Sequence, residues 1–338
     1  MREVNYNISY MRLFATIAVV IMHVCTTIVD NVDLFGPSNT QATVLLCVSI
    51  ACRWAVPAFF MITGYLLLDS SKEIDYPLVF KKYCLRILLV LIIFGIPFAA
   101  MKNITDFNGI FDLCKKTFLA VLSNNGFGHF WYLYVLIGLY LIMPVIKIFI
   151  AHARNKKTVE ILALILFVFC SVIPLIRDVF GVSIAFSIPL TYPVFYLLMG
   201  YLIKKHLNRI PAVAAIIGFV TGAVLLIVLT VLIRKPGLYE YHSPFVVAMG
   251  LGVFVFFLRL KLKGNDFVWK LDRLSFGVYI IHPVFIHVVY RLVKITPLKF
   301  GEIGYVAMIP VFAAAFLVIS FVCVWVMMLI KPLKKYVL

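Results

Sequence analysis

The stretch ISYMRLFATIAVVIMHVCTTIV, residues 8–29, is almost wholly apolar, yet it contains two ionisable side chains, Arg12 and His23. A helix of this length, at about 1.5 Å per residue, crosses the hydrocarbon core of a membrane. At about 100° per residue, the spacing of Arg12 and His23 returns to within about 20° of the same helix face. Ionisable groups inside a membrane are costly and are by default functional. The stretch therefore predicts a membrane-spanning helix with a functional polar stripe.

The rest of the chain has the same apolar character. Hydrophobic residues make up 64% of the 338 residues and charged residues only 13%, which excludes an ordinary soluble domain. Strand-like alternation is absent, which disfavours a β-barrel. We predict an all-α, polytopic membrane helical bundle of about ten transmembrane helices, forming a single integral membrane domain over residues 1–338. The expected spans are 8–29, 42–68, 84–101, 128–149, 158–176, 188–203, 212–233, 244–258, 273–293 and 304–330.

The distribution of positive charge predicts the orientation of the chain. The formal net charge is +17. If the N-terminus is cytoplasmic, the cytoplasmic segments carry about twenty Lys and Arg and the opposite segments about nine, which is the positive-inside bias. We therefore expect both termini in the cytoplasm, and we attribute the positive charge to topology and not to nucleic-acid binding.

The predicted span interiors contain basic side chains but no carboxylates, since Asp30, Glu160 and Asp272 fall at span ends. This pattern disfavours a carboxylate-driven proton pump and a carboxylate-rich metal site, and the cysteines show no metal-ligand spacing, so no metal is expected. A buried cation without a carboxylate needs water, backbone carbonyls or a bound anion. The pattern points to a negatively charged ligand. The basic groups are Arg12, His23, Arg53, His282 and His287, the last interpreted as structural or as a residue at the lipid edge.

Three of these groups share a depth in the membrane. At about 1.5 Å per residue, His23 lies about 20 Å, Arg53 about 16 Å and His282 about 14 Å from the ends at which their spans begin. Neighbouring hydroxyls could satisfy each of them separately. Their shared depth favours one polar site built from three spans.

Prolines accompany two of the three groups. In RWAVPAFFMITGY, residues 53–65, Pro57 lacks an N–H, which frees the carbonyl of Arg53 and predicts a kink. In LSFGVYIIHP, residues 274–283, Tyr279 and His282 lie on one helix face, and Pro283 predicts a bend beside His282. Both patterns predict irregular helix next to a polar group.

A basic cluster precedes the third span, in FKKYCLRI, residues 80–87. Lys82 and Arg86 are spaced to share a helix face, with Lys81 beside them. The cluster could hold the phosphates of a nucleotide-like donor, or it could be a positive-inside anchor.

An aromatic cluster opens the fourth span, in GHFWYL, residues 128–133. His129, Trp131 and Tyr132 could be interface anchors, which are common at span ends. Alternatively they form a platform for a sugar or a lipid head group at the outer surface.

Taken in order, these segments resemble acyltransferase family 3, a family of integral membrane enzymes. The resemblance rests on Arg12 and His23, FFMITGY, KKYCLR, HFWYL and LSFGVYIIHP, and covers essentially the whole chain. Thr63 stands where the family usually has Ser, and Lys82 stands where it often has Arg; both departures are mild. Each motif alone is weak, whereas the ordered set is fairly specific.

The resemblance implies an O-acyltransferase in the bacterial plasma membrane. Such an enzyme moves an acyl group, usually acetyl, from cytoplasmic acyl-CoA to a hydroxyl of a cell-surface glycan or of its lipid-linked precursor. Acetyl-CoA would be a donor substrate and not a permanently bound cofactor. The expected partners are acyl-CoA, the glycan acceptor and membrane lipid, without nucleic acid.

On this hypothesis, His23 acts as a neutral general base on the acceptor hydroxyl, or it attacks the thioester and carries the acyl group. Arg12 holds a phosphate or polarises the pantetheine end of the donor, and Arg53 stabilises the oxyanion. His282, backed by Tyr279, orients the acceptor or shares the proton. Two other classes of function stay open: a translocase of lipid-linked or polymeric glycans, and a membrane signal receptor.

Overall fold

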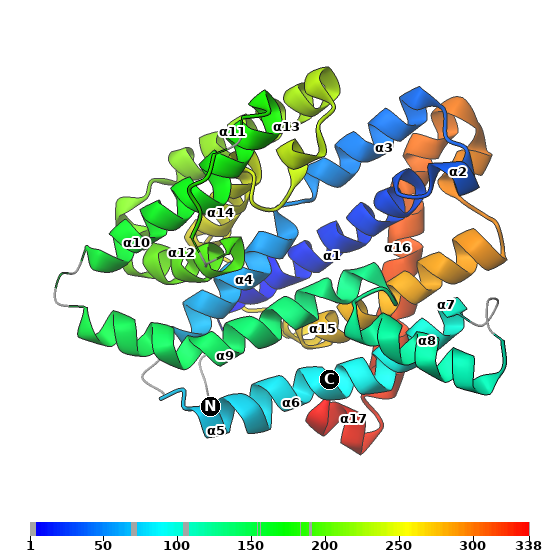
Figure 1. The fold of residues 1–338 in the computed structure, drawn as a ribbon, viewed down its shortest axis with the longest axis horizontal. Coiled ribbons are helices and arrows are strands. Elements are labelled where there is room, and N and C mark those ends of the chain that lie inside the picture. The colour runs from blue at the N-terminus through cyan, green and yellow to red at the C-terminus, as the bar shows by residue number, and fades with distance from the viewer. Residues whose placement is uncertain are drawn as a thin grey trace. The chain divides into compact units, whose positions relative to one another are not determined.

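The computed structural model describes residues 5–68, 73–103, 108–153, 155, 157–182, 184–188 and 191–337. All regular secondary structure in those residues is helical (Figure 1). Nine helical stretches in the described part are long and apolar enough to cross a membrane, which confirms an all-α membrane protein. They contain α1 (Tyr6–Val29); α3 (Asn39–Ala51) with α4 (Ala55–Leu67); α5 (Tyr76–Leu78), α6 (Leu85–Val90) and α7 (Ile96–Asn103); α9 (Trp131–His152); α10 (Thr158–Phe167) with α11 (Ile173–Phe180); α13 (Ala212–Ile233); α14 (Pro244–Arg259); α15 (Asp266–His287); and α16 (Gly301–Met327).

The expected sixth span, 188–203, does not qualify as a spanning helix. Its helix, α12 (Tyr192–His206), has 15 residues, and residues 189–190 lie outside the described part. At about 1.5 Å per residue this helix is about 22 Å long, short of the roughly 30 Å of a hydrocarbon core. Its first half is buried, and the helix packs against α4 and α10. Protein, not lipid, surrounds this part of α12, so the helix does not need full spanning length.

The described residues fall into two compact units. The first is drawn from Met1–Ser71, Phe149–Ser275 and Pro297–Ala315, and the second from Lys72–Ile148, Phe276–Thr296 and Phe316–Leu338.

Which side of the membrane holds the termini stays a prediction. Arg2, Lys72, Arg154 and Lys156, which count toward the predicted charge bias, lie outside the described residues.

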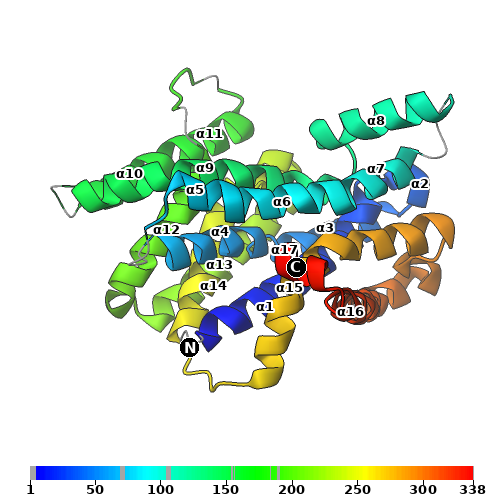
Figure 2. The same cartoon turned by 90° about the horizontal axis from the view of Figure 1, so that it is seen from below.

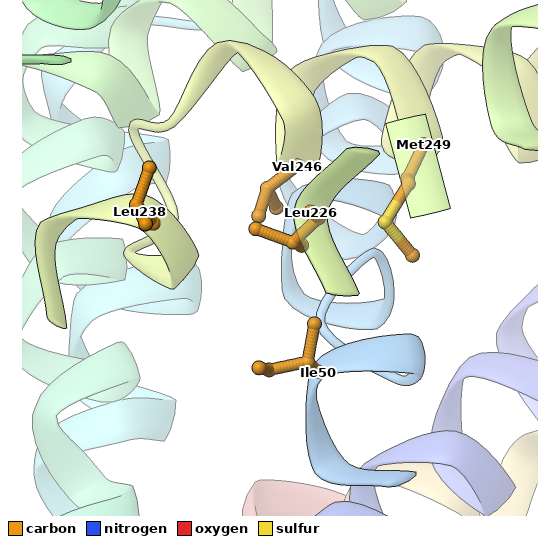
Figure 3. Packing of buried hydrophobic residues seen from close by; sticks show 5 residues of the cluster. All are labelled: Ile50, Leu226, Leu238, Val246 and Met249. Atoms are coloured by element: carbon orange, nitrogen blue, oxygen red, sulfur yellow. The ribbon is translucent and has the colours of Figure 1, made fainter. Parts of the chain in front are cut away.

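In the first unit, α1 packs along α3 and α4, and α13 packs along α14 (Figure 1). A core of aliphatic side chains joins α3, α13 and α14 to the short 3₁₀ turn Pro236–Tyr239 (Figure 3). Its fully buried members are Ile50, Leu226, Leu238, Val246 and Met249.

Two glycines bring α4 and α12 into backbone contact. A Cβ atom at Gly64 would lie 1.9 Å from the carbonyl oxygen of Leu197, and one at Gly200 would lie 2.0 Å from that of Met61. Small residues permit this close approach between membrane helices. Lys204 Nζ lies 5.0 Å from the centre of the Tyr65 ring, which places the C-terminal ends of the two helices together.

The kink expected near Pro57 is a short tight turn between α3 and α4, within one candidate membrane-spanning stretch, Asn39–Leu67. Backbone N–H groups of Cys52, Arg53 and Ala55 donate to carbonyls three residues earlier, so a tight turn replaces the helix at Cys52–Trp54. Pro57 falls in the first turn of α4, where a missing N–H costs little. The turn leaves Arg53 between two helices.

In the second unit, the span Tyr76–Asn103 contains π-helical turns at Val79–Cys84 and Leu91–Gly95. It is followed by α8 (Ile110–Leu122), an amphipathic helix. Figure 2 shows α8 beside α7, the helix it packs against. The chain ends in the short helix α17 (Lys331–Tyr336).

Candidate functional site

Arg12 makes an ion pair that was not expected from the predicted spans, which placed Asp272 at a span end. Its Nη1 atom lies 2.8 Å from both carboxylate oxygens of Asp272, and the hydroxyl of Ser9 donates to the same carboxylate. Because α15 begins at Asp266 and not at residue 273, Asp272 lies inside the helix and inside a candidate span. The prediction that the buried cations have no carboxylate partner is wrong at Arg12.

His23 is a half-buried side chain on α1. Its imidazole hydrogen-bonds to the backbone of Val19, one helical turn earlier, and it is close enough to Arg53 for their charges to interact. A carbonyl oxygen only accepts, so the ring nitrogen facing it carries the proton. The second nitrogen of a neutral ring is then an acceptor, which is the form that a general base requires.

Arg53 lies against two tyrosine rings that the sequence analysis did not identify. Its guanidinium carbon is 5.0 Å from the centre of the Tyr239 ring and 5.2 Å from that of Tyr241. Its Nε atom is buried and has no hydrogen-bond partner among the described residues. A buried donor of this kind is costly unless a ligand or water satisfies it. The guanidinium can therefore offer an N–H to an oxygen that a substrate brings.

Tyrosine side chains link this arginine to the segment that bears the histidine. The hydroxyl of Tyr196, on α12, donates to the carbonyl of Tyr241 at 2.7 Å. The hydroxyl of Tyr241 donates to Sδ of Met22, the neighbour of His23, at 3.7 Å. Tyr239, Glu240, Tyr241 and His242 form a run of polar side chains that is visible in the sequence. Only the tertiary structure shows that the two tyrosines of this run lie beside Arg53.

In the second unit, His282, Tyr279 and His129 form one cluster. His282 is fully buried, with Nδ1 2.9 Å from the carbonyl oxygen of Val278. Nε2 of His129 lies 3.1 Å from the carbonyl oxygen of Ile280, and the Tyr279 hydroxyl donates to the carbonyl of His129. As at His23, one nitrogen of the His282 ring carries a proton toward a carbonyl one turn earlier, which leaves the other as an acceptor.

The structure modifies the prediction for the aromatic cluster at residues 128–133. His129 is 6% exposed, so it is part of the packing between η3 (Gly128–Phe130) and α15 and not an accessible rim residue. Tyr132 joins it, with its ring centre 5.6 Å from that of Tyr279. Trp131 is half-buried, with its ring centre 6.3 Å from that of Tyr132. These predicted residues thus gather with Tyr279 and His282.

The basic cluster lies where the helix is irregular. Lys81 and Lys82 are exposed and lie in the π-helical turn Val79–Cys84, where hydrogen bonds join residues five apart. Nε of Arg86 donates to the carbonyl of Val337 at 3.0 Å, and its guanidinium covers the Phe276 ring.

Outside the membrane-spanning stretches, Asp112 accepts hydrogen bonds in the first turn of α8. The backbone N–H of Asn108 and the ammonium of Lys116 both donate to its carboxylate, and these bonds lower the pKa of Asp112 below its usual value. Among the described residues, no three His, Cys, Asp or Glu side chains lie close enough to hold a metal ion.

Comparison with known proteins gives one match that covers nearly the whole chain. The family model described as "Acyltransferase domain", that of acyltransferase family 3, matches residues 5–329. No curated protein and no solved structure matches the chain significantly.

Proposed function

The chain belongs to acyltransferase family 3, and on that basis we propose that it is an O-acyltransferase that uses acetyl-CoA. The acetyl group goes to a hydroxyl of a cell-surface glycan or of its lipid-linked precursor, at the bacterial plasma membrane. Family membership accounts for acyl transfer within a membrane. The donor and the acceptor are our proposal.

The pair formed by His23 and Arg53 is the observation that carries this proposal. His23 offers a ring nitrogen that accepts a proton, and Arg53 offers a buried N–H in the same unit. Acyl transfer between a thioester and a hydroxyl requires a base for the hydroxyl and a donor for the developing oxyanion.

The chemical steps follow from these two roles. His23 takes the proton of the acceptor hydroxyl while that oxygen attacks the thioester carbonyl. The carbonyl oxygen becomes an oxyanion, to which Arg53 donates a hydrogen bond. The intermediate collapses with cleavage of the carbon–sulfur bond, and the CoA sulfur leaves with the proton from His23. In the two-step variant, His23 itself attacks the thioester and the C–S bond breaks, which releases CoA as its thiolate. The acceptor hydroxyl then attacks the acyl-imidazole, which releases His23, and the hydroxyl proton passes to the CoA thiolate.

Arg12 is better suited to the pantetheine end of the donor than to a phosphate. Asp272 neutralises the guanidinium through Nη1, so the pair as a whole carries no net charge. A neutral pair gains little from a phosphate but still donates hydrogen bonds to an amide carbonyl. We keep Lys81, Lys82 and Arg86 as the proposed phosphate ligands.

In the second unit, we propose that His282 and Tyr279 orient the acceptor or share its proton. His129 and Tyr132 support them through the contacts described above, and Trp131 borders the cluster.

Thiol release from acetyl-CoA by the purified chain in lipid nanodiscs tests the function. We expect release that His23→Ala abolishes and that His152→Ala, at an exposed histidine ending α9, leaves unchanged. Release that persists in His23→Ala would overturn the role of His23. If the wild type neither binds acetyl-CoA nor releases thiol, the donor assignment fails, and glycan flux in vesicles without acyl-CoA would then favour a translocase.

A further inference from the structure

Four tyrosines of the first unit gather around Arg53. Tyr239 and Tyr241 lie against its guanidinium, and Tyr196 donates to the backbone of Tyr241. The Tyr192 ring centre lies 6.3 Å from that of Tyr196 and 6.2 Å from that of His242. Tyr192, Tyr239 and Tyr241 keep part of their surface exposed.

The aliphatic core fixes this cluster in place. Leu238, next to Tyr239, is only 1% exposed and belongs to the same buried core cluster as Leu226 and Val246 (Figure 3). Tyr239 and Tyr241 pack against the same core. Because Leu238 anchors the turn Pro236–Tyr239, the rings of Tyr239 and Tyr241 are held in position before a ligand arrives. This lowers the entropic cost of binding.

The cluster borders the proposed catalytic base. The hydroxyl of Tyr241 reaches Met22, the residue before His23, and Arg53 interacts electrostatically with His23. A molecule seated on these rings would lie near the base and near the proposed oxyanion donor.

The charges around the cluster do not favour an anionic ligand. Asp30 lies close enough to Arg53 for their charges to interact. Asp30, Glu240 and Arg53 all interact electrostatically with Tyr239. Beyond Tyr192, Asp178 pairs with Arg177 at 3.1 Å and lies 3.9 Å from Nε2 of His242. The nearby carboxylates thus offset the arginine, so a carboxylate or phosphate ligand would meet like charges.

We infer that Tyr192, Tyr239 and Tyr241 form the acceptor-binding surface of the enzyme, and that this surface takes an uncharged sugar ring. The apolar face of a sugar fits an aromatic ring, while its hydroxyls donate to carboxylates such as Asp30 and Glu240. The inference rests on the proposed acyltransferase function and adds the class of acceptor and the residues that recognise it.

The test measures acetyl transfer by the full chain in nanodiscs. The probes are methyl glycosides of neutral hexoses and N-acetylhexosamines, compared with a methyl hexuronate. For Tyr239→Ala we expect a rise of about tenfold in the KM for neutral probes, while the KM for acetyl-CoA changes less than about twofold. Tyr239→Phe keeps the ring and should stay close to the wild type. Tyr201→Ala, on the same helix as Tyr192, is the matched control.

Several results would overturn the inference. These are an unchanged acceptor KM in a folded Tyr239→Ala, a rise in the acetyl-CoA KM instead, preference for the hexuronate, or an active enzyme that transfers to no neutral probe. Rescue by Tyr239→Trp guards against a folding defect in the alanine variant. If the wild type neither binds acetyl-CoA nor releases thiol from it, the proposed function fails first. If thiol release persists and only the acceptor results disagree, this inference alone fails.

Discussion

Nη1 of Arg12 lies 2.8 Å from both carboxylate oxygens of Asp272, so one carboxylate of α15 holds the cation near the start of α1. The Asp272 side chain is 6% exposed and that of Arg12 is 30% exposed. Removing either partner leaves the other charge poorly compensated, although water reaches the arginine in part.

We expect Asp272→Ala to lower the free energy of unfolding by about 1–3 kcal/mol, because Arg12 loses its partner. Thermal unfolding in detergent measures this change. The double variant Arg12→Met, Asp272→Leu should recover most of the stability, since neither charge is then left alone. The same double variant should still bind acetyl-CoA more weakly than the wild type. Full recovery of donor binding would assign Arg12 a structural role only.

For Arg53→Lys we expect kcat to fall about 10²–10³-fold with little change in the KM of the donor, because Lys keeps the charge but lacks the Nε donor. Steady-state kinetics of the acetyl transfer would measure both constants. Arg177→Lys, which changes an exposed arginine of the same unit, is the control. Equal loss in both variants would argue against a specific role for Arg53.

Gly64→Ala should destabilise the protein by about 1–3 kcal/mol or more, because its Cβ would lie 1.9 Å from a backbone oxygen that cannot move independently. Gly200→Ala should behave in the same way. Gly138→Ala is the matched control, since nothing lies within 4 Å of its Cβ and the residue is exposed on α9. The control should leave stability unchanged or raise it by up to about 1 kcal/mol, as measured by thermal unfolding. A tolerated Gly64→Ala would contradict the backbone contact.

The pH should affect the start of α8 through Asp112. Its hydrogen bonds to Asn108 and Lys116 lower the pKa in the folded helix, so they stabilise α8 above the unfolded pKa. That contribution is lost as the pH falls through the lowered value. Hydrogen exchange of the first turn of α8, corrected for intrinsic rates, should show less protection at acid pH. Asp112→Asn should reduce the protection at neutral pH and remove its dependence on pH in this range.

Much of the fold could be predicted from hydropathy, because the length and apolar character of a membrane span are visible in its own sequence. The turn at Arg53 followed from Pro57, whose effect on a helix is local. The start of α15 was missed although its signal was local: the Asn265 side chain accepts from the backbone N–H groups of Phe267 and Val268. Such a cap marks a helix start, and it places Asp272 within the helix.

Tertiary contacts could not be predicted in the same way. The spacing of Tyr239 and Tyr241 says nothing about Arg53, because the aliphatic core decides where their turn lies. Likewise, no local pattern connects Arg86 to the carbonyl of Val337. His23 and Arg53 could be identified from the sequence, because an ionisable side chain is energetically unfavourable inside a membrane span. The tyrosines are common in such sequences, and only their tertiary contacts show a role.

The backbone contact at Gly64 and Gly200 has a consequence for how substrates enter and leave. Close backbone packing at this crossing leaves α4 and α12 little room to move independently, so we expect their movements to be coupled. Arg53 precedes α4 and Tyr192 begins α12, so we expect the proposed oxyanion donor and the proposed acceptor surface to move together when substrates enter and leave.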